Sequence, residues 1–197
     1  AVGASWPNAG CGPPVRRAPP KRPDPGRMAT PRRSSIPQGV LDRLRAVAPH
    51  LDAPEDTAAY CRAWRDGFDG WTPLVLRPSS TSDVSEILRI CHETRTPVVP
   101  QSGNTGLTGA SQPHDDGSEV VLSFDRMDRV RAVDIDDDAM IVEAGVILKS
   151  AQEAAEAAGR RFPLSIAAEG SARMGGVIAA NAGGVTALRY GVMRDLV

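Results

Sequence analysis

The sequence has 197 residues, a length typical of one domain, and its 41% hydrophobic and 24% charged residues are ordinary for a globular protein. No run approaches the roughly 18 apolar residues that a membrane helix needs, so we expect no membrane segment. The net charge is −1, but the first 39 residues hold seven basic residues against one acid, which leaves 16 basic and 23 acidic residues in 40–197. This acidic balance argues against a nucleic-acid partner.

Residues 1–39 are rich in proline and arginine. They contain nine prolines and almost no apolar periodicity, so the composition predicts a disordered tail. Position 1 is not Met, whereas Met28 is a candidate initiator, and we expect residues 1–27 to be an over-extended start. The folded domain is expected to occupy residues 40–197.

The three cysteines, Cys11, Cys61 and Cys91, lie far apart and show no metal-ligand spacing. They support neither a disulfide framework nor a zinc site. Cys61 and Cys91 occupy apolar positions of helical patterns and are expected to be small buried side chains. This use of cysteine indicates a reducing, cytoplasmic location.

The chain before the first glycine-rich segment reads as helices and strands in alternation. Hydrophobic spacing predicts helices at 40–48 and 54–64, a strand at 74–76, a helix after Ser80 and a strand at 98–99. The helix after Ser80 is the clearest of these, because Ser80 and Asp83 have the spacing of a capping box. Strand, helix, strand and Gly-rich loop is the order of a βαβ unit, and such units bind ligands at the carboxyl ends of their strands.

Three glycines at a spacing of three follow the strand at 98–99, within Pro-Val-Val-Pro-Gln-Ser-Gly-Asn-Thr-Gly-Leu-Thr-Gly at residues 97–109. Glycine lets the backbone adopt positive φ and lets a ligand approach without meeting a Cβ atom. Backbone N–H groups in a concave turn can hold a phosphate or pyrophosphate. An ordinary Gly-rich surface turn is the alternative interpretation.

Downstream of this loop the pattern changes to strands at short spacing. They are expected at 119–123, 130–134 and 140–144. The acidic turn at 136–138 fits a hairpin tip better than a calcium site, because no further ligand series follows it. An Ala-rich helix is predicted from Gly145 to Gly159.

Residues 162–184 form a second stretch of glycine and small residues, in which only Glu169 and Arg173 are charged. So few bulky side chains indicate a backbone that lies flat against something large. Close helix packing through Gly175 and Gly176 is the alternative. Two such stretches in one short chain favour a long ligand held between them.

Taken together, these motifs resemble the FAD-binding domain of the vanillyl-alcohol-oxidase or PCMH type. Within that family the resemblance is strongest to the flavin-dependent D-2-hydroxyacid dehydrogenases, which include D-lactate dehydrogenases, the FAD subunit of glycolate oxidase and D-2-hydroxyglutarate dehydrogenase. It covers residues 70–197 and rests on segments 97–109, 122–127, 142–145, 162–164, 170–171, 175–176, 181–184 and 189–191. It implies the amino-terminal portion of such an enzyme, with an α+β fold: a small N-terminal βαβ subdomain and a larger mixed or antiparallel sheet flanked by helices, incomplete at the C-terminus.

The resemblance also implies where the cofactor lies, with residues 102–106 around the FAD pyrophosphate and residues 163–184 along the isoalloxazine and ribityl portion. The implied cofactor-binding residues are Ser102, Gly103, Asn104, Thr105, Gly106, Leu107, Thr108, Gly109, Pro163, Gly170, Ser171, Gly175, Gly176, Asn181 and Gly183. Many relatives have Gly in place of Ser102, whose hydroxyl could reach a phosphate oxygen. Members that attach flavin covalently through this loop carry His in place of Thr105, so the resemblance implies noncovalent FAD.

The implied reaction is oxidation of a D-2-hydroxy acid of the lactate, glycolate or 2-hydroxyglutarate class to a 2-oxo acid, with hydride passing to flavin N5. In this family the catalytic histidine and metal ligands belong to a separate substrate domain, and the electron acceptor is left open. His50, His92 and His114 do not cluster in the sequence. We therefore expect no catalytic or metal-binding residue in this chain, substrate binding only together with the substrate domain, and an inactive chain on its own.

Two other classes of function stay open. One is a noncatalytic truncated fragment that binds FAD weakly or not at all, and the other is an unrelated phosphate-binding module. A P-loop is disfavoured because no Lys-Ser or Lys-Thr follows Gly109. A Rossmann site is disfavoured because no long helix and ribose-binding acid follow the glycines at the expected distance.

Overall fold

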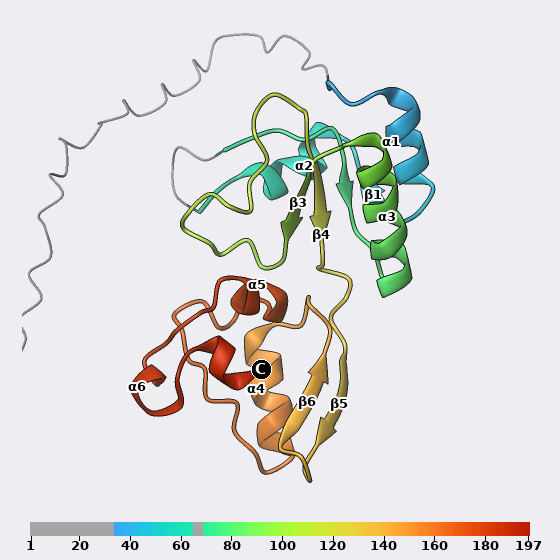
Figure 1. Cartoon of the computed structure of the whole chain (residues 1–197). Helices are drawn as coiled ribbons and strands as arrows, with labels where there is room; N and C mark the ends of the chain where they lie inside the picture. Colours follow the sequence, from blue (N-terminus) through green and yellow to red (C-terminus); the bar gives the residue numbers. More distant parts are fainter. Residues whose placement is uncertain (1–33, 65–68) are drawn as a thin grey trace, which may run out of the picture.

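The computed structural model describes residues 34–64 and 69–197, which form two lobes (Figure 1). The first lobe holds α1 (Gln38–Arg45), β1 (His50–Leu51), α2 (Pro54–Cys61), β2 (Val75–Leu76), α3 (Thr81–Thr94), β3 (Val98–Gln101) and β4 (Val120–Ser123). The second lobe holds β5 (Val130–Asp134), β6 (Ala139–Val142), α4 (Leu148–Ala157), α5 (Met174–Ala179), α6 (Ala187–Tyr190) and the short 3-10 helix η1 (Met193–Leu196). No helix within the described ranges is long and apolar enough to cross a membrane.

The amino-terminal boundary lies earlier than the sequence pattern suggests. Residues 1–33 of the expected tail lie outside the described residues. Residues 34–39 belong to the fold, because the Ser34 hydroxyl donates to the Gly117 carbonyl at 3.1 Å, Ile36 is buried, and α1 begins at Gln38. The expected helix at 54–64 is shorter than its apolar pattern, since α2 ends at Cys61 and the backbone of Arg62 is already extended.

The first lobe is built on a four-stranded mixed sheet with the order β1-β2-β4-β3. Strands β2, β4 and β3 are parallel, and β1 pairs with β2 antiparallel at the edge. The expected βαβ unit is present as β2-α3-β3, with β4 inserted between its strands. The sequence pattern groups the strand at 119–123 with the downstream strands, which is wrong. Its four consecutive buried residues are instead typical of a parallel strand covered on both faces.

Alternation along the strands divides the apolar side chains between the two faces of this sheet. Leu74, Leu76, Val120 and Leu122 point to one face, where they pack in a single cluster with residues of α1 and α3. Val75 and Val121 belong to the other cluster, next to Tyr60 of α2. Apolar side chains therefore cover both faces of the sheet around β2 and β4.

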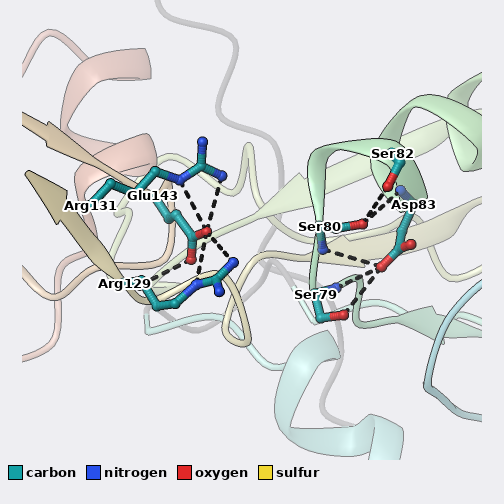
Figure 2. Close-up of polar contacts among 7 residues, drawn as sticks. All are labelled: Ser79, Ser80, Ser82, Asp83, Arg129, Arg131 and Glu143. Atoms are coloured by element: carbon teal, nitrogen blue, oxygen red, sulfur yellow. Dashed lines mark hydrogen bonds and ion pairs between the residues drawn. The ribbon is translucent and has the colours of Figure 1, made fainter.

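Helix α3 begins as the capping-box spacing predicts. The Ser80 hydroxyl accepts a hydrogen bond from the Asp83 backbone N–H at 3.1 Å, and the Asp83 carboxylate accepts from the Ser80 N–H at 3.2 Å (Figure 2). The carboxylate also accepts from the Ser79 N–H at 3.0 Å. These bonds satisfy N–H groups that have no partner inside the helix, which fixes where α3 begins.

The second lobe has its own core, formed by α4, α5, η1 and the loops between them against the inner face of the β5–β6 hairpin. The acidic turn at 136–138 is the hairpin tip, as expected. Helix α4 begins at Leu148, three residues later than predicted. Gly145 serves close packing instead, because a Cβ there would lie 1.9 Å from the Phe124 carbonyl oxygen.

The α+β class is confirmed, with a mixed sheet flanked by helices. The relative size of the sheets differs from the expectation, since the mixed sheet of the first lobe has four strands and the antiparallel sheet of the described second lobe has two. Cys61 and Cys91 are buried, as predicted from their helical positions.

Candidate functional site

The candidate site lies where the parallel strands end. Because β3 and β4 are parallel, their carboxyl ends meet at one edge of the sheet. Residues 102–104 leave the end of β3, and Ser123 and Asp125 mark the end of β4. This edge faces the second lobe (Figure 1).

The two Gly-rich stretches meet across this edge. A Cβ on Gly103 would lie 2.4 Å from the Ser171 carbonyl oxygen and 3.0 Å from the Arg173 backbone nitrogen. The Ser102 hydroxyl donates to the Ala144 carbonyl at 3.0 Å, and a Cβ on Gly176 would touch the Ser102 side chain at 3.4 Å. Residues far apart in sequence therefore form a single surface, as a ligand held between them would require.

A cavity of about 340 Å³ opens between these segments. It is lined by Ala59, Tyr60, Gln101, Ser102, Gly103, Asn104, Ser123, Asp125, Ile147, Gly170, Ser171 and Arg173. Its volume falls in the lower part of the usual range of about 300–1,000 Å³ for small-molecule sites. The lining comes from both lobes, so the cavity is a property of their junction.

The three glycines of the first loop do not share one structural role. Of the three, only Gly109 has positive φ, at 76°. Gly103 is required by the close backbone of the second lobe, whereas a Cβ on Gly106 would meet its nearest neighbour, the Ser111 hydroxyl, only at 4.0 Å. Asn104 itself takes the left-handed conformation, with φ of 51°, a region that asparagine tolerates better than most residues.

The Asn104 side chain holds this loop to its surroundings. Its amide Nδ2 donates to the Arg62 carbonyl at 3.1 Å, and its Oδ1 accepts from the Ser111 hydroxyl at 3.1 Å and from the Gln112 amide. The buried Gln101 donates to the carbonyls of Tyr60 and Ser111 at 2.7 and 2.8 Å. The loop is thus fixed by hydrogen bonds before any ligand arrives, which lowers the entropy cost of binding.

A charged cluster forms the end of the cavity beside β4. Arg77 Nη2 lies 2.9 Å from Asp125 Oδ2, and the Tyr60 hydroxyl donates to the same oxygen at 2.9 Å. Burial acts to raise the pKa of Asp125, but the hydrogen bonds from Arg77 and Tyr60 outweigh it, so the pKa lies below its usual value. Burial and the hydrogen bond to Asp125 raise the pKa of Tyr60. Asp125 is therefore a carboxylate at neutral pH, and Tyr60 a neutral hydroxyl.

The structure brings five of the expected cofactor residues into the cavity lining, namely Ser102, Gly103, Asn104, Gly170 and Ser171. Thr105, Gly106, Leu107, Thr108 and Gly109 continue the loop beyond the lining, where Leu107 is 52% exposed. Gly175 packs against Ala144, and Gly176 against Ser102. The second stretch therefore packs closely through its helix, while Gly170 and Ser171 line the cavity, and its contact with a ligand stays a prediction.

The remaining expected cofactor residues lie within the second lobe, away from the cavity lining. The Pro163 carbonyl accepts from the Thr186 hydroxyl, and the Asn181 side chain accepts from the Arg194 backbone N–H at 2.9 Å. A Cβ on Gly183 would meet Val192 at 3.0 Å, so this glycine allows the chain to turn against η1. These contacts hold the second lobe together.

Sequence reasoning missed the lining residues that come from other elements. Ser123 and Asp125 follow a strand end, and the rule that found the first glycine loop would have found them had β4 been placed in the parallel sheet. Tyr60 and Ile147 reach the cavity only through tertiary packing. His50 lies on β1, His92 on α3, and His114 on an exposed loop beside Glu119 at 3.1 Å, and none of the three lines the cavity.

Several solved structures share the fold of this chain. An alkyldihydroxyacetonephosphate synthase superimposes with a TM-score of 0.73 over 82% of this chain and 32% of its own, at 18% sequence identity. A p-cresol methylhydroxylase with bound substrate gives a TM-score of 0.61 over 76% of this chain and 31% of its own, at 17% identity. The chain therefore has the fold of part of each of these two enzymes.

A family model described as "FAD binding domain" matches residues 72–197, and the chain belongs to this family. Membership supports FAD as the cofactor. Bovine mitochondrial D-2-hydroxyglutarate dehydrogenase is 36% identical over 83% of this chain, and the match covers 30% of that protein. D-lactate dehydrogenase of Archaeoglobus fulgidus is 44% identical over 63% of this chain and 27% of its own length. The chain thus corresponds to less than a third of these relatives, and the resemblance to PCMH-type D-2-hydroxyacid dehydrogenases is confirmed.

Proposed function

We propose that the cavity at the lobe junction binds FAD without a covalent bond, with the pyrophosphate against residues 102–106. The observation that carries this proposal is that two Gly-rich stretches, far apart in sequence, face one cavity at the carboxyl ends of parallel strands. A cavity of this size accommodates part of a dinucleotide, and the rest of FAD would extend along the neighbouring surface. The surface beside Gly170 is open to such an extension, because a Cβ on this residue would meet no atom within 4 Å.

The proposed binding set keeps all fifteen cofactor residues named from the sequence. Ser102, Gly103, Asn104, Gly170 and Ser171 have direct access to the cavity. Thr105 and Gly106 would complete the pyrophosphate contacts at the rim of the cavity, and Leu107 to Gly109 would contact the cofactor where it leaves the cavity. Pro163, Gly175, Gly176, Asn181 and Gly183 would act by shaping the second lobe against which the cofactor lies.

The proposed reaction of the whole enzyme is oxidation of a D-2-hydroxy acid to a 2-oxo acid. Bound FAD supplies the acceptor for the hydride that leaves C2 of the substrate. Support comes from the names of the relatives, which include D-2-hydroxyglutarate and D-lactate dehydrogenases. Within the described residues the contribution of this chain is to bind and orient the cofactor, and substrate binding and electron transfer to an acceptor are assigned to other parts of the enzyme.

A second candidate is a noncatalytic fragment that binds FAD weakly or not at all. It is favoured by the size of the cavity, which at about 340 Å³ accommodates only part of a dinucleotide. The two candidates share the fold and differ in the affinity of this chain for FAD.

The visible spectrum of the purified chain separates the two candidates. We expect added FAD to co-purify through gel filtration, with absorption bands of protein-bound flavin, and acid precipitation to release all of it into the supernatant because the link is noncovalent. Folded protein that remains colourless with excess FAD would leave only the second candidate. Flavin retained in the acid precipitate would overturn noncovalent binding.

The cytoplasmic location inferred from the cysteines stays a prediction. The bovine relative is named as mitochondrial, which weighs against it. Localisation of the tagged protein by fractionation of the source cells decides between the two compartments.

A further inference from the structure

Formal charge is scarce in the cavity. Of its lining residues only Asp125 and Arg173 are charged, and residues 102–109 of the glycine loop carry no charge at all. A pyrophosphate diester is a dianion. The neutral dipoles of a backbone loop hold such a group more strongly when a cation lies within reach.

The charge of Asp125 is already compensated. Arg77 approaches it through two nitrogens, with Nε 3.0 Å from both carboxylate oxygens and Nη2 2.9 Å from one. Tyr60 supplies a further hydrogen bond. With its side chain only 16% exposed, Asp125 presents little free negative charge to a ligand.

Arg173 forms no ion pair of this kind among the described residues, although its charge is close enough to Asp125 to help lower the pKa of that carboxyl. Its Nη1 donates to the backbone carbonyls of Gly145 and Asp125, at 2.6 and 3.3 Å. Both acceptors are neutral, and none of the ion pairs among residues 34–64 and 69–197 includes Arg173. The guanidinium is therefore held in place by one nitrogen, and in the described structure its other N–H groups make no hydrogen bond to protein.

We propose that Arg173 is the cationic residue that binds the phosphate groups of the cofactor. This inference rests on the proposed function. Arg173 lies next to the point where the two stretches touch, because its backbone nitrogen is 3.0 Å from the position of a Cβ on Gly103. A guanidinium presents several donors in a fixed plane that matches phosphate oxygens, and being weakly hydrated it costs less to desolvate than an ammonium group. In this proposal the backbone of the glycine loop provides a surface that fits the phosphate groups, and Arg173 provides the positive charge.

Arg173 also has a structural role, and the choice of variants has to separate that role from cofactor binding. Its two carbonyl contacts tie the end of β4 to the segment after β6, so replacing it also removes a link between the lobes. R173Q retains an amide donor that can reach a carbonyl but loses the charge, whereas R173K retains the charge but loses the planar arrangement of donors. R189Q is the matched control, since Arg189 lies on α6 over the ring of Tyr190 and outside the cavity lining.

The experiment measures dissociation constants of the full chain for three probes, FAD, ADP and riboflavin, at low and raised salt. ADP carries two phosphates without the flavin ring, and riboflavin carries the ring without phosphate. For R173Q we expect FAD and ADP to bind about 10–100-fold more weakly, with a smaller salt dependence and unchanged riboflavin binding. R173K should lose less than about tenfold, and R189Q should match the wild type.

A second variant tests the charge without changing Arg173. D125N removes the opposing carboxylate and frees the charge of Arg77, so ADP should bind more tightly. Unchanged ADP affinity in folded R173Q and D125N, or a loss in R173Q that is equal for riboflavin and FAD, would overturn the role of Arg173 while leaving FAD binding intact. Wild-type chain that binds neither FAD nor ADP would overturn the proposed function itself.

Discussion

At Gly103 the backbones of the two lobes approach each other closely in the site. The atoms that a Cβ would meet there are backbone atoms of Ser171, Ala172 and Arg173, at 2.4 to 3.1 Å. Backbone cannot rotate away as a long side chain can, so any side chain at this position forces the lobes apart. The size of residue 103, and not its φ angle, is what the structure constrains.

The substitution Gly103→Ala tests this constraint. We expect it to lower the free energy of unfolding by about 1–3 kcal/mol because of the overpacked contact, and to weaken FAD binding because the cavity widens. Chemical denaturation and a flavin titration measure the two effects. Gly39→Ala is the control, since a Cβ there meets no atom within 4 Å; it should leave FAD binding unchanged and raise the stability by at most about 1 kcal/mol, because Gly39 lies in α1 and alanine is the better helix former. Wild-type stability in Gly103→Ala would show that the lobes can separate at no cost.

The segment after strand β6 connects the hairpin to the site. Glu143 follows β6 with its side chain 1% exposed, and it accepts hydrogen bonds from Arg129 and Arg131 at 2.9 and 3.0 Å (Figure 2). The next two carbonyls, of Ala144 and Gly145, accept the hydrogen bonds from Ser102 and Arg173. Glu143 therefore fixes the strand end on which the cavity depends.

This ion cluster predicts a pH dependence of stability. The hydrogen bonds from Arg129 lower the pKa of Glu143 from 4.5 to about 2, so folding favours its charged form. The stabilisation is complete above pH 4.5 and is lost as the pH falls towards 2. E143Q should be less stable by about 1–3 kcal/mol at neutral pH and should lose less stability on acidification.

Thermal unfolding across this pH range measures the difference between the two proteins. E153Q is the control, because Glu153 is exposed on α4, and its unfolding should follow the wild type. Parallel pH profiles for E143Q and wild type would contradict the assignment of the acid-sensitive step to Glu143.

At the scale of the whole molecule, two cores explain the position of the site. In the first lobe, helices pack on both faces of the mixed sheet. In the second lobe, α4 and α5 pack against one face of the β5–β6 hairpin. Neither core crosses the junction, where polar contacts join the two lobes, from Ser102 to Ala144 and from Arg173 to Asp125. A ligand at the junction contacts both lobes and would stabilise their arrangement in proportion to its affinity.

We expect no turnover of D-lactate or D-2-hydroxyglutarate by this chain alone, because the cavity lining contains no histidine and its carboxylate is held by Arg77. Reduction of an electron-accepting dye, with FAD binding confirmed on the same sample, measures this. Free FAD under the same conditions gives the background. Turnover clearly above it would mean that Tyr60 or another described residue acts as the catalytic group.

The sequence by itself determined the local features of this protein. The capping box at Ser80 defines the start of α3, and the alternation of strands, helices and glycine loops defines the α+β family, because these signals lie within a few residues of one another. The family resemblance that these motifs carry also implied Ser102 to Asn104 and Gly170 to Ser171 as candidate site residues.

Only the tertiary structure decided which groups share the cavity. Strand β1 has only two residues, too few for a recognisable hydrophobic pattern. The position of β4 in the sheet follows only from its pairing with β2 and β3. Asp125 is contacted by three residues that are distant in the sequence, namely Tyr60 at a separation of 65 residues and Arg77 and Arg173 at 48 residues each. Such contacts depend on how two separately formed cores dock, and no local spacing encodes that arrangement.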